Sequence, residues 1–146
     1  MMNLTISKDV TIRVPRRELT GLFERVMNSE RCAGGRGGIN LVFSTDHHLR
    51  ALNRRFLNRQ RTTDVLAFPL STERPDASDE IVGEIYISVP VARRQADSYG
   101  VTLTSELLRL FCHGLLHLLG YDHKKAADAT VMRAREDCYL RRPRRL

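Results

Sequence analysis

The sequence predicts an α+β fold, a single domain with a mainly four-stranded mixed sheet packed by about five helices. Segments with the apolar patterns of strands crowd the first half of the chain, and segments with helical periodicity dominate the second half. The 146 residues suffice for one packed domain, and no linker divides them. We therefore expect one domain over residues 1–140 and a basic C-terminal tail over residues 141–146.

Extended structure is expected at the N-terminus, where apolar and polar side chains alternate through Val14 around a possible turn at Lys8-Asp9. A helix is predicted over residues 16–29, because its apolar side chains fall on one face. The glycine-rich run 34–38 lacks the lysine and hydroxyl residue of a phosphate-binding loop, so a flexible linker is favoured there over a ligand cradle.

The middle of the chain carries the remaining strands. Residues 39–43 form a short apolar strand, and residues 44–46 offer N-cap chemistry for a helix with apolar residues as far as Leu57. Two further strands are predicted over residues 65–70 and 81–88, with a polar, proline-containing loop between them.

Three helices are predicted in the C-terminal part. The first spans residues 91–99 and ends at Gly100, a typical C-cap residue. The second begins at Thr104 or Ser105, is strongly apolar and runs to Leu119, so we expect it in the core. A last amphipathic helix leads into the basic tail.

Charge and composition limit the possible partners and compartments. The 24 basic and 17 acidic residues give a net charge of +7, carried largely by arginine, which binds phosphate oxygens through a bidentate fork. This balance is compatible with nucleic acid as a partner and equally with a solvated basic surface. The three cysteines form no CxxC pair, the N-terminus does not resemble a leader, and no apolar window reaches about 18 residues. A reduced, cytoplasmic protein outside the membrane is predicted.

Three of the five histidines fall within eleven residues, in the run HGLLHLLGYDH. His113 and His117 are four residues apart, so their imidazoles project from the same face of a helix. Gly120 can adopt a left-handed conformation that ends the helix and turns the chain back, which would bring His123 to the same point. The pattern predicts a metal site on the apolar helix and the turn after it.

Three histidines at about 2.0–2.1 Å from a zinc ion leave one tetrahedral position for water, and such an open site lowers the pKa of that water to about 7. We therefore expect one Zn²⁺ with three histidine ligands and hydrolytic chemistry. The spacing is that of the metzincin proteases, but these have a glutamate after the first histidine, where this chain has Gly114. A peptidase is thereby disfavoured.

Other roles for these histidines stay open. Each could be a satisfied core histidine on an apolar helix, and a closed structural zinc site would need a fourth protein ligand. Cys112 is the nearest sulfur, but it points about 100° away around the helix. His47 and His48 lie beside the N-cap of another helix, where surface or capping roles are favoured over metal binding.

The run from His113 to His123 resembles the histidine signature of the YbeY family of endoribonucleases. Residues 63–69 read TDVLAFP, similar to the family pattern TDVLSFP, and residues 83–88 are similar to its GD-I-IS strand. The resemblance runs roughly over residues 39–140. Further positions that fit the family pattern are Leu52, Asn53, Met132 and Glu136.

This resemblance implies the family's α+β fold and a metal-dependent hydrolase, with zinc as the expected metal. It implies cleavage of single-stranded RNA in the maturation of 16S ribosomal RNA and in ribosome quality control. The implied partners are ribosomal RNA and, beyond it, the ribosomal subunit or its proteins. Hydroxide on the zinc could attack a phosphodiester while arginines hold the flanking phosphates.

The chain departs from the family pattern at Leu57, where the family usually has an arginine. Arg55, Arg59 and Arg61 lie nearby as candidates for contacts with substrate phosphates, with a solvated face as the alternative. Glu84 replaces a family aspartate and keeps a carboxylate that could contact a metal ligand. Leu57 stands where the family usually has an arginine, and Gly114 stands where metzincins have their glutamate. The alternative function is therefore a zinc-stabilised ribosome- or RNA-binding factor with weak or no catalysis.

Overall fold

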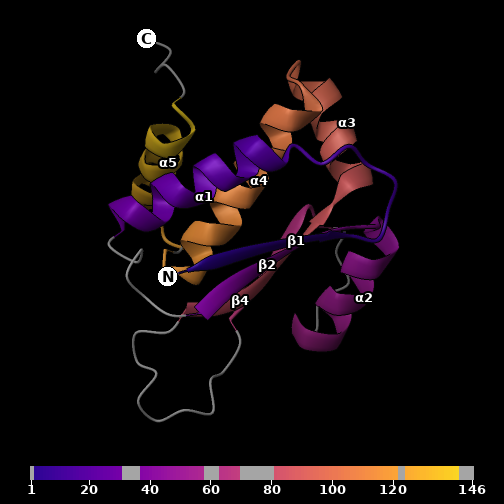
Figure 1. Ribbon diagram of the computed structural model, residues 1–146, viewed down its shortest axis with the longest axis horizontal. Coiled ribbons are helices and arrows are strands. Elements are labelled where there is room, and N and C mark those ends of the chain that lie inside the picture. The colour runs from indigo at the N-terminus through magenta and orange to yellow at the C-terminus, as the bar shows by residue number, and fades with distance from the viewer. Residues whose placement is uncertain (1, 31–36, 58–62, 70–80, 122–123, 142–146) are drawn as a thin grey trace.

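A computed structural model gives the fold of the chain (Figure 1). It describes residues 2–30, 37–57, 63–69, 81–121 and 124–141. The strands are β1 (Asn3–Lys8), β2 (Gly37–Ser44), β3 (Val65–Pro69) and β4 (Ile81–Ser88). The helices are α1 (Arg16–Ser29), α2 (Asp46–Leu57), α3 (Val89–Tyr99), α4 (Leu103–Leu118) and α5 (Ala126–Leu140). Over the described residues, the predicted single α+β domain is confirmed.

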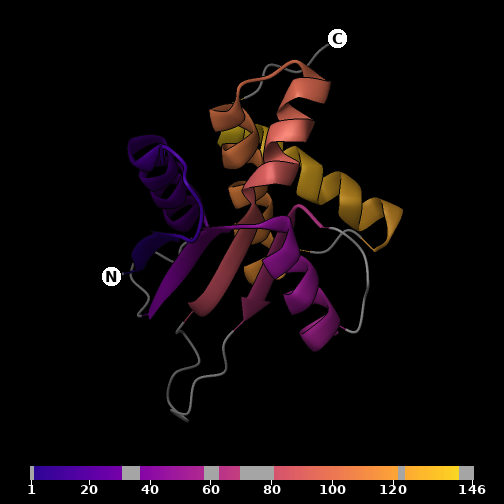
Figure 2. The ribbon, with the colours of Figure 1, turned by 90° about the vertical axis from the view of Figure 1, so that its right-hand side faces the viewer.

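The four strands form one mixed sheet in the order β1-β2-β4-β3. Strands β1, β2 and β4 are parallel, and β3 pairs antiparallel to β4 as an edge strand. Helices α1, α4 and α5 pack together on one side of the sheet, whereas α2 lies on the other side (Figures 1 and 2). The largest set of buried side chains lies between α1, α4 and the sheet.

Helix α4 is the core helix that the apolar pattern predicted, with eight buried residues and contacts to α1, α3, α5, β3 and β4. It begins earlier than expected, because the hydroxyl of Thr102 accepts a hydrogen bond from the Ser105 N–H at 3.1 Å and caps the helix there. Gly120 follows the helix with φ of 100°, the left-handed conformation expected at this position.

Other helix ends follow local side-chain chemistry. Thr45 is the cap of α2, since its Oγ1 accepts from the His48 N–H at 3.0 Å. Helix α3 begins at Val89, earlier than predicted, because Ser88 caps it and Pro90 fits the first turn, where a backbone N–H is not required. Gly100, with φ of 66°, ends α3 as predicted.

The N-terminal segment differs from the prediction. Strand β1 ends at Lys8, because the chain leaves the sheet after the Asp9 N–H has donated to the Phe43 carbonyl at 2.8 Å. Of the glycine run predicted as a linker, Gly37 and Gly38 begin β2, and Gly38 pairs with Asn3 of β1. The rest of that run, the loop at 71–80 and the tail from 142 lie outside the described residues.

The cysteines differ in their exposure. Cys112 is buried and Cys138 is exposed, while Cys32 lies outside the described residues. No helix in the described ranges has the length and apolarity needed to cross a bilayer.

Two glycines let α4 lie directly on β4. A Cβ atom added to Gly114 would lie 2.9 Å from Cγ2 of Ile85, and one added to Gly83 would lie 2.8 Å from Cδ1 of Leu118. Ile85 is fully buried, so it has little room to move away. Gly114 therefore faces the sheet, and the position where metzincins have their glutamate is a packing contact in this chain.

We predict that Gly114→Ala destabilises the protein. Overpacking against Ile85 costs about 1–3 kcal/mol, and the gain in helix propensity of up to about 1 kcal/mol offsets only part of it. Urea denaturation of Gly21→Ala provides the control, because a Cβ at Gly21 in α1 meets only Arg25 Nη1 at an ordinary 3.5 Å. The packing argument fails if both variants are equally stabilised.

Candidate functional site

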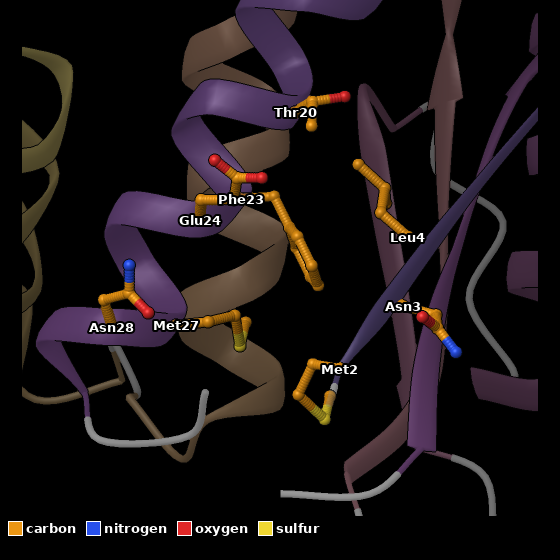
Figure 3. Close-up of a pocket in the computed structure, with 8 residues that line it drawn as sticks. All are labelled: Met2, Asn3, Leu4, Thr20, Phe23, Glu24, Met27 and Asn28. Atoms are coloured by element: carbon orange, nitrogen blue, oxygen red, sulfur yellow. The ribbon is translucent and has the colours of Figure 1, made fainter. Parts of the chain in front are cut away.

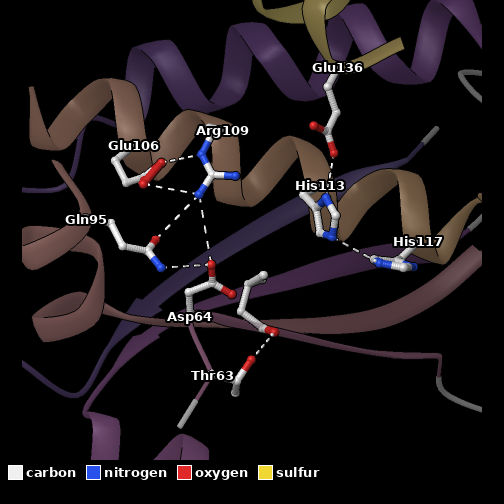
Figure 4. Close-up of polar contacts among 9 residues, drawn as sticks. Thr63, Asp64, Gln95, Glu106, Arg109, His113, His117 and Glu136 are labelled. Carbon is white, nitrogen blue, oxygen red and sulfur yellow. Dashed lines mark hydrogen bonds and ion pairs between the residues drawn. The ribbon is translucent and has the colours of Figure 1, made fainter. Parts of the chain in front are cut away.

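Two histidines project from one face of α4. The Nε2 atoms of His113 and His117 are 3.1 Å apart, and their ring centroids are 4.6 Å apart in an edge-to-face arrangement (Figure 4). Because α4 places residues four apart on the same side, this pairing follows directly from the sequence spacing. Both rings direct the same nitrogen toward one point.

Helix α5 supplies a carboxylate to this pair. Oε1 of Glu136 lies 2.5 Å from Nδ1 of His113, and the two side chains are 13% and 25% exposed. Since an ionised carboxylate can only accept, Nδ1 of His113 donates the proton, and Nε2 of the neutral ring keeps a lone pair. A carboxylate behind a histidine in this way is typical of metal ligands, whose tautomer and ring direction it fixes.

The donor set of this histidine pair fits a divalent metal ion. Two nitrogens bound to one tetrahedral zinc at about 2.0–2.1 Å lie about 3.3 Å apart, close to the observed separation of 3.1 Å. A hydrogen bond between the two rings satisfies the same distance. The predicted third ligand, His123, lies outside the described residues, within which no group of three or more histidine, cysteine or carboxylate side chains is placed to hold a metal.

The other predicted site residues lie apart from the histidines or outside the described ranges. Arg55 is exposed on α2, with its guanidinium carbon 5.4 Å from the Phe56 ring centroid. Arg59 and Arg61 lie outside the described residues. Glu84 lies on the face of β4 opposite to Ile85, and its Oε2 accepts a hydrogen bond from the Tyr86 hydroxyl at 3.0 Å.

A polar network is centred on α4, one to two helical turns before His113. Glu106 is buried, and its two oxygens accept from Nε and Nη2 of Arg109, the latter at 3.2 Å (Figure 4). Nη2 also reaches Gln95 Oε1 at 3.5 Å, and Gln95 Nε2 donates to Asp64 Oδ2 at 3.3 Å. The network thus joins α3, α4 and the start of β3.

Arg109 is held in this network as a permanent cation. Burial acts to lower the pKa of Arg109, but the hydrogen bond and charge of Glu106 and the charge of Asp64 outweigh it, so the pKa is raised. Among the described residues, Arg109 is the cation that compensates the buried charge of Glu106. The network thus fixes the position of α4 along the sheet, and with it the position of His113.

Sequence reasoning missed the contacts that join different helices and strands around the histidine pair. Glu106 and Arg109 are spaced three apart on an otherwise apolar helix, and that spacing was an available signal for a buried pair. The partner of His113 had only a weak signal, because Glu136 lies 23 residues away and matched the family pattern without an assigned role.

A separate pocket of about 370 Å³ lies between α1 and the edge strand β1 (Figure 3). Its lining residues are Met2, Asn3, Leu4, Thr20, Phe23, Glu24, Met27 and Asn28. Glu24 is the one ionisable side chain among them, so the pocket offers no acid–base or metal-binding constellation. The histidine pair therefore remains the candidate site among the described residues.

We predict that Arg109→Met destabilises the protein by about 3–5 kcal/mol, because it leaves the charge of Glu106 buried without its cation. The control Arg50→Met removes an exposed pair with Asp46 at 3.6 Å and costs no more than about 1 kcal/mol. Urea denaturation at neutral pH measures both variants. Equal losses in the two variants would contradict the role of the buried pair.

Comparison with known proteins agrees with the predicted resemblance. A family model described as Endoribonuclease YbeY matches residues 4–143. An Endoribonuclease YbeY of Moorella thermoacetica is 41% identical over 133 residues, which cover 84% of this chain and 85% of the relative. One from Pelotomaculum thermopropionicum is 39% identical over 130 residues, covering 85% and 86%.

A similar fold has been determined in solution for a protein of Thermotoga maritima. It matches with a TM-score of 0.60 and 28% sequence identity, covering 94% of this chain and 86% of that one. Together, the family match over most of the chain and the two relatives at about 40% identity confirm the resemblance seen in the histidine run. The chain belongs to the YbeY family of endoribonucleases.

Proposed function

We propose that the protein is a zinc-dependent endoribonuclease that cleaves single-stranded RNA in the maturation of 16S ribosomal RNA and in ribosome quality control. Membership of the YbeY family supports RNA cleavage. The observation that carries the metal dependence is the His113 and His117 pair with Glu136 behind His113. His123 is the proposed third ligand, within a catalytic domain of residues 1–140.

The protein's own residues prepare this site. Glu136 accepts the Nδ1 proton of His113 and so keeps its Nε2 lone pair directed at the site. The contact of Gly114 with Ile85 holds α4 on the sheet, so the two imidazoles cannot turn away. A zinc ion bound by these histidines would polarise a phosphoryl oxygen and lower the pKa of a water molecule.

Charge supports RNA as the substrate. The net charge of +7 attracts the phosphate backbone, and Arg55, with Arg59 and Arg61, is the proposed group that contacts phosphates of the substrate. Ribosomal RNA, the ribosomal subunit and its proteins are the proposed partners in the cytoplasm. The basic tail over residues 141–146 would add to this attraction.

The alternative is a zinc-stabilised RNA- or ribosome-binding factor with weak or no catalysis. It is favoured by Leu57, which stands where the family usually has an arginine, and by Gly114, whose position leaves no space for a carboxylate base. The two functions differ in one measurable respect. The enzyme must lose cleavage with its metal, whereas the binding factor shows no metal-dependent cleavage at all.

We predict that His117→Ala removes both zinc and activity. The variant should retain far less than the approximately one zinc per chain expected of the parent, and its cleavage of a ribosomal RNA fragment should fall by at least about 100-fold. Zinc content measured by mass spectrometry and cleavage with and without chelator test this. His47→Ala, an exposed histidine on α2, is the control that should change neither.

Cleavage that survives both chelation and His117→Ala would contradict the metal-dependent mechanism. Zinc bound without cleavage would instead support the binding-factor alternative. If the parent protein contains no zinc and adding zinc does not restore its cleavage of RNA, the proposed site is contradicted.

We predict that Glu136→Gln weakens zinc binding by about 10–100-fold, because a neutral amide accepts the Nδ1 proton of His113 less strongly than a carboxylate. Competition against a coloured chelator measures this affinity. Asp137→Asn removes a neighbouring charge on α5 and should leave the affinity within about threefold, because Asp137 makes no described contact with His113. Equal weakening in both variants would mean that general charge, rather than the contact, is responsible.

A further inference from the structure

Phe56 is a large apolar side chain exposed at the end of α2, with 59% of its surface accessible. Its ring meets Phe68 of β3 edge-to-face at 5.6 Å, and Phe68 meets Tyr86 of β4 at 6.1 Å. The buried side of the Phe56 ring is therefore supported by a row of aromatic rings. More than half of the Phe56 surface is accessible to solvent, where an apolar ring has an unfavourable contact with water.

Two arginines of α2 precede Phe56 in the sequence. Arg55 places its guanidinium carbon 5.4 Å from the Phe56 centroid, and Arg54 precedes it in the same helical turn. Neither arginine forms an ion pair with a carboxylate among the described residues. Glu84, the cross-strand partner of Phe68, accepts a hydrogen bond from the Tyr86 hydroxyl. An aromatic face beside uncompensated arginines is the chemistry that binds a base and its phosphates.

Phe56 and the histidine pair lie on opposite sides of the same edge strand. Helix α4 contacts β3 on one face, where Val65 and Ala67 pack toward the core, and α2 contacts it on the other face through Phe68. Figure 2 shows α2 and α4 on the two sides of this part of the sheet. Strand β3 is five residues long and is the edge strand of the sheet, so the two faces are separated by the width of one short strand.

We propose that Phe56 stacks on an unpaired base of the RNA substrate while Arg54 and Arg55 neutralise the flanking phosphates. This inference rests on the proposed function and extends it by naming a determinant of single-strand specificity. In a duplex both faces of every internal base are covered by neighbouring bases, so only an unpaired base can lie on the ring. Stacking of one base on an aromatic side chain contributes about 1–3 kcal/mol.

The other exposed large apolar side chains of the described residues, Tyr99, Val101 and Val131, lack this combination. Tyr99 on α3 also has an arginine near its ring, but that residue, Arg109, is already paired with Glu106. Val131 on α5 is exposed but has no aromatic face. Tyr99 is therefore a matched control, since it has similar exposure and the same type of neighbour but no free cation beside it.

The experiment measures fluorescence anisotropy of labelled RNA with nuclease-resistant phosphorothioate linkages and the zinc-loaded full chain, and a gel after each titration confirms that the RNA is intact. The probes are oligoadenylate and oligouridylate of about ten nucleotides and a blunt RNA duplex. Adenine stacks more strongly than uracil, so the parent should prefer oligoadenylate. Phe56→Ala should weaken oligoadenylate binding by roughly 5- to 150-fold, reduce this preference and leave duplex binding within about twofold.

Phe56→Trp should keep the preference for oligoadenylate, because the indole preserves the stacking face, and Tyr99→Ala should bind all three probes as the parent does. The inference is overturned if Phe56→Ala binds oligoadenylate as tightly as the parent, if it loses single-strand and duplex binding equally, or if the parent has no preference. This experiment measures RNA binding and not cleavage. If the parent protein showed no metal-dependent cleavage in a separate assay, the proposed function would be contradicted, but the binding result for Phe56 would still hold.

Discussion

The close contact between α4 and β4 is the constraint on which the rest of the structure depends. Gly114 meets Ile85, and Gly83 meets Leu118, at distances that leave no space for a Cβ atom on either glycine. A helix without such contacts would lie farther from the sheet, since side chains on both surfaces would separate them. The depth at which α4 is seated sets the height of His113 above the sheet and the position at which α5 can pack.

A polar network fixes the remaining freedom of α4. Glu106 and Arg109 form a buried pair that Gln95 and Asp64 extend to α3 and β3. Buried charges are tolerated only when paired, so sliding or rotating the helix would expose a charge to an apolar environment. The glycine contacts and this network together hold the two histidines in a defined direction before any ligand is bound, which is the preorganisation that a hydrolytic site requires.

The sheet edge at β3 separates two kinds of chemistry. On the α4 side are the imidazoles and the carboxylate of Glu136, which suit bond cleavage. On the α2 side are Phe56 and Arg55, which suit binding of a base and its phosphates. Leu57, directly after the exposed ring, stands where the resemblance described above implies an arginine. In this chain, the positive charge near the ring comes from Arg54 and Arg55, which precede Phe56 in the same helical turn.

The sequence by itself determined the features that depend on local spacing. The interval from His113 to His117 places both rings on one helical face, and the left-handed conformation at Gly120 follows from its missing side chain. Short apolar segments located β2, β3 and β4 to within a few residues. Only the tertiary structure decided that Glu136 contacts His113 and that Gly114 is a packing residue rather than a lost catalytic position. These contacts join elements far apart in the chain, and they depend on the depth and register of packing, which no local pattern specifies.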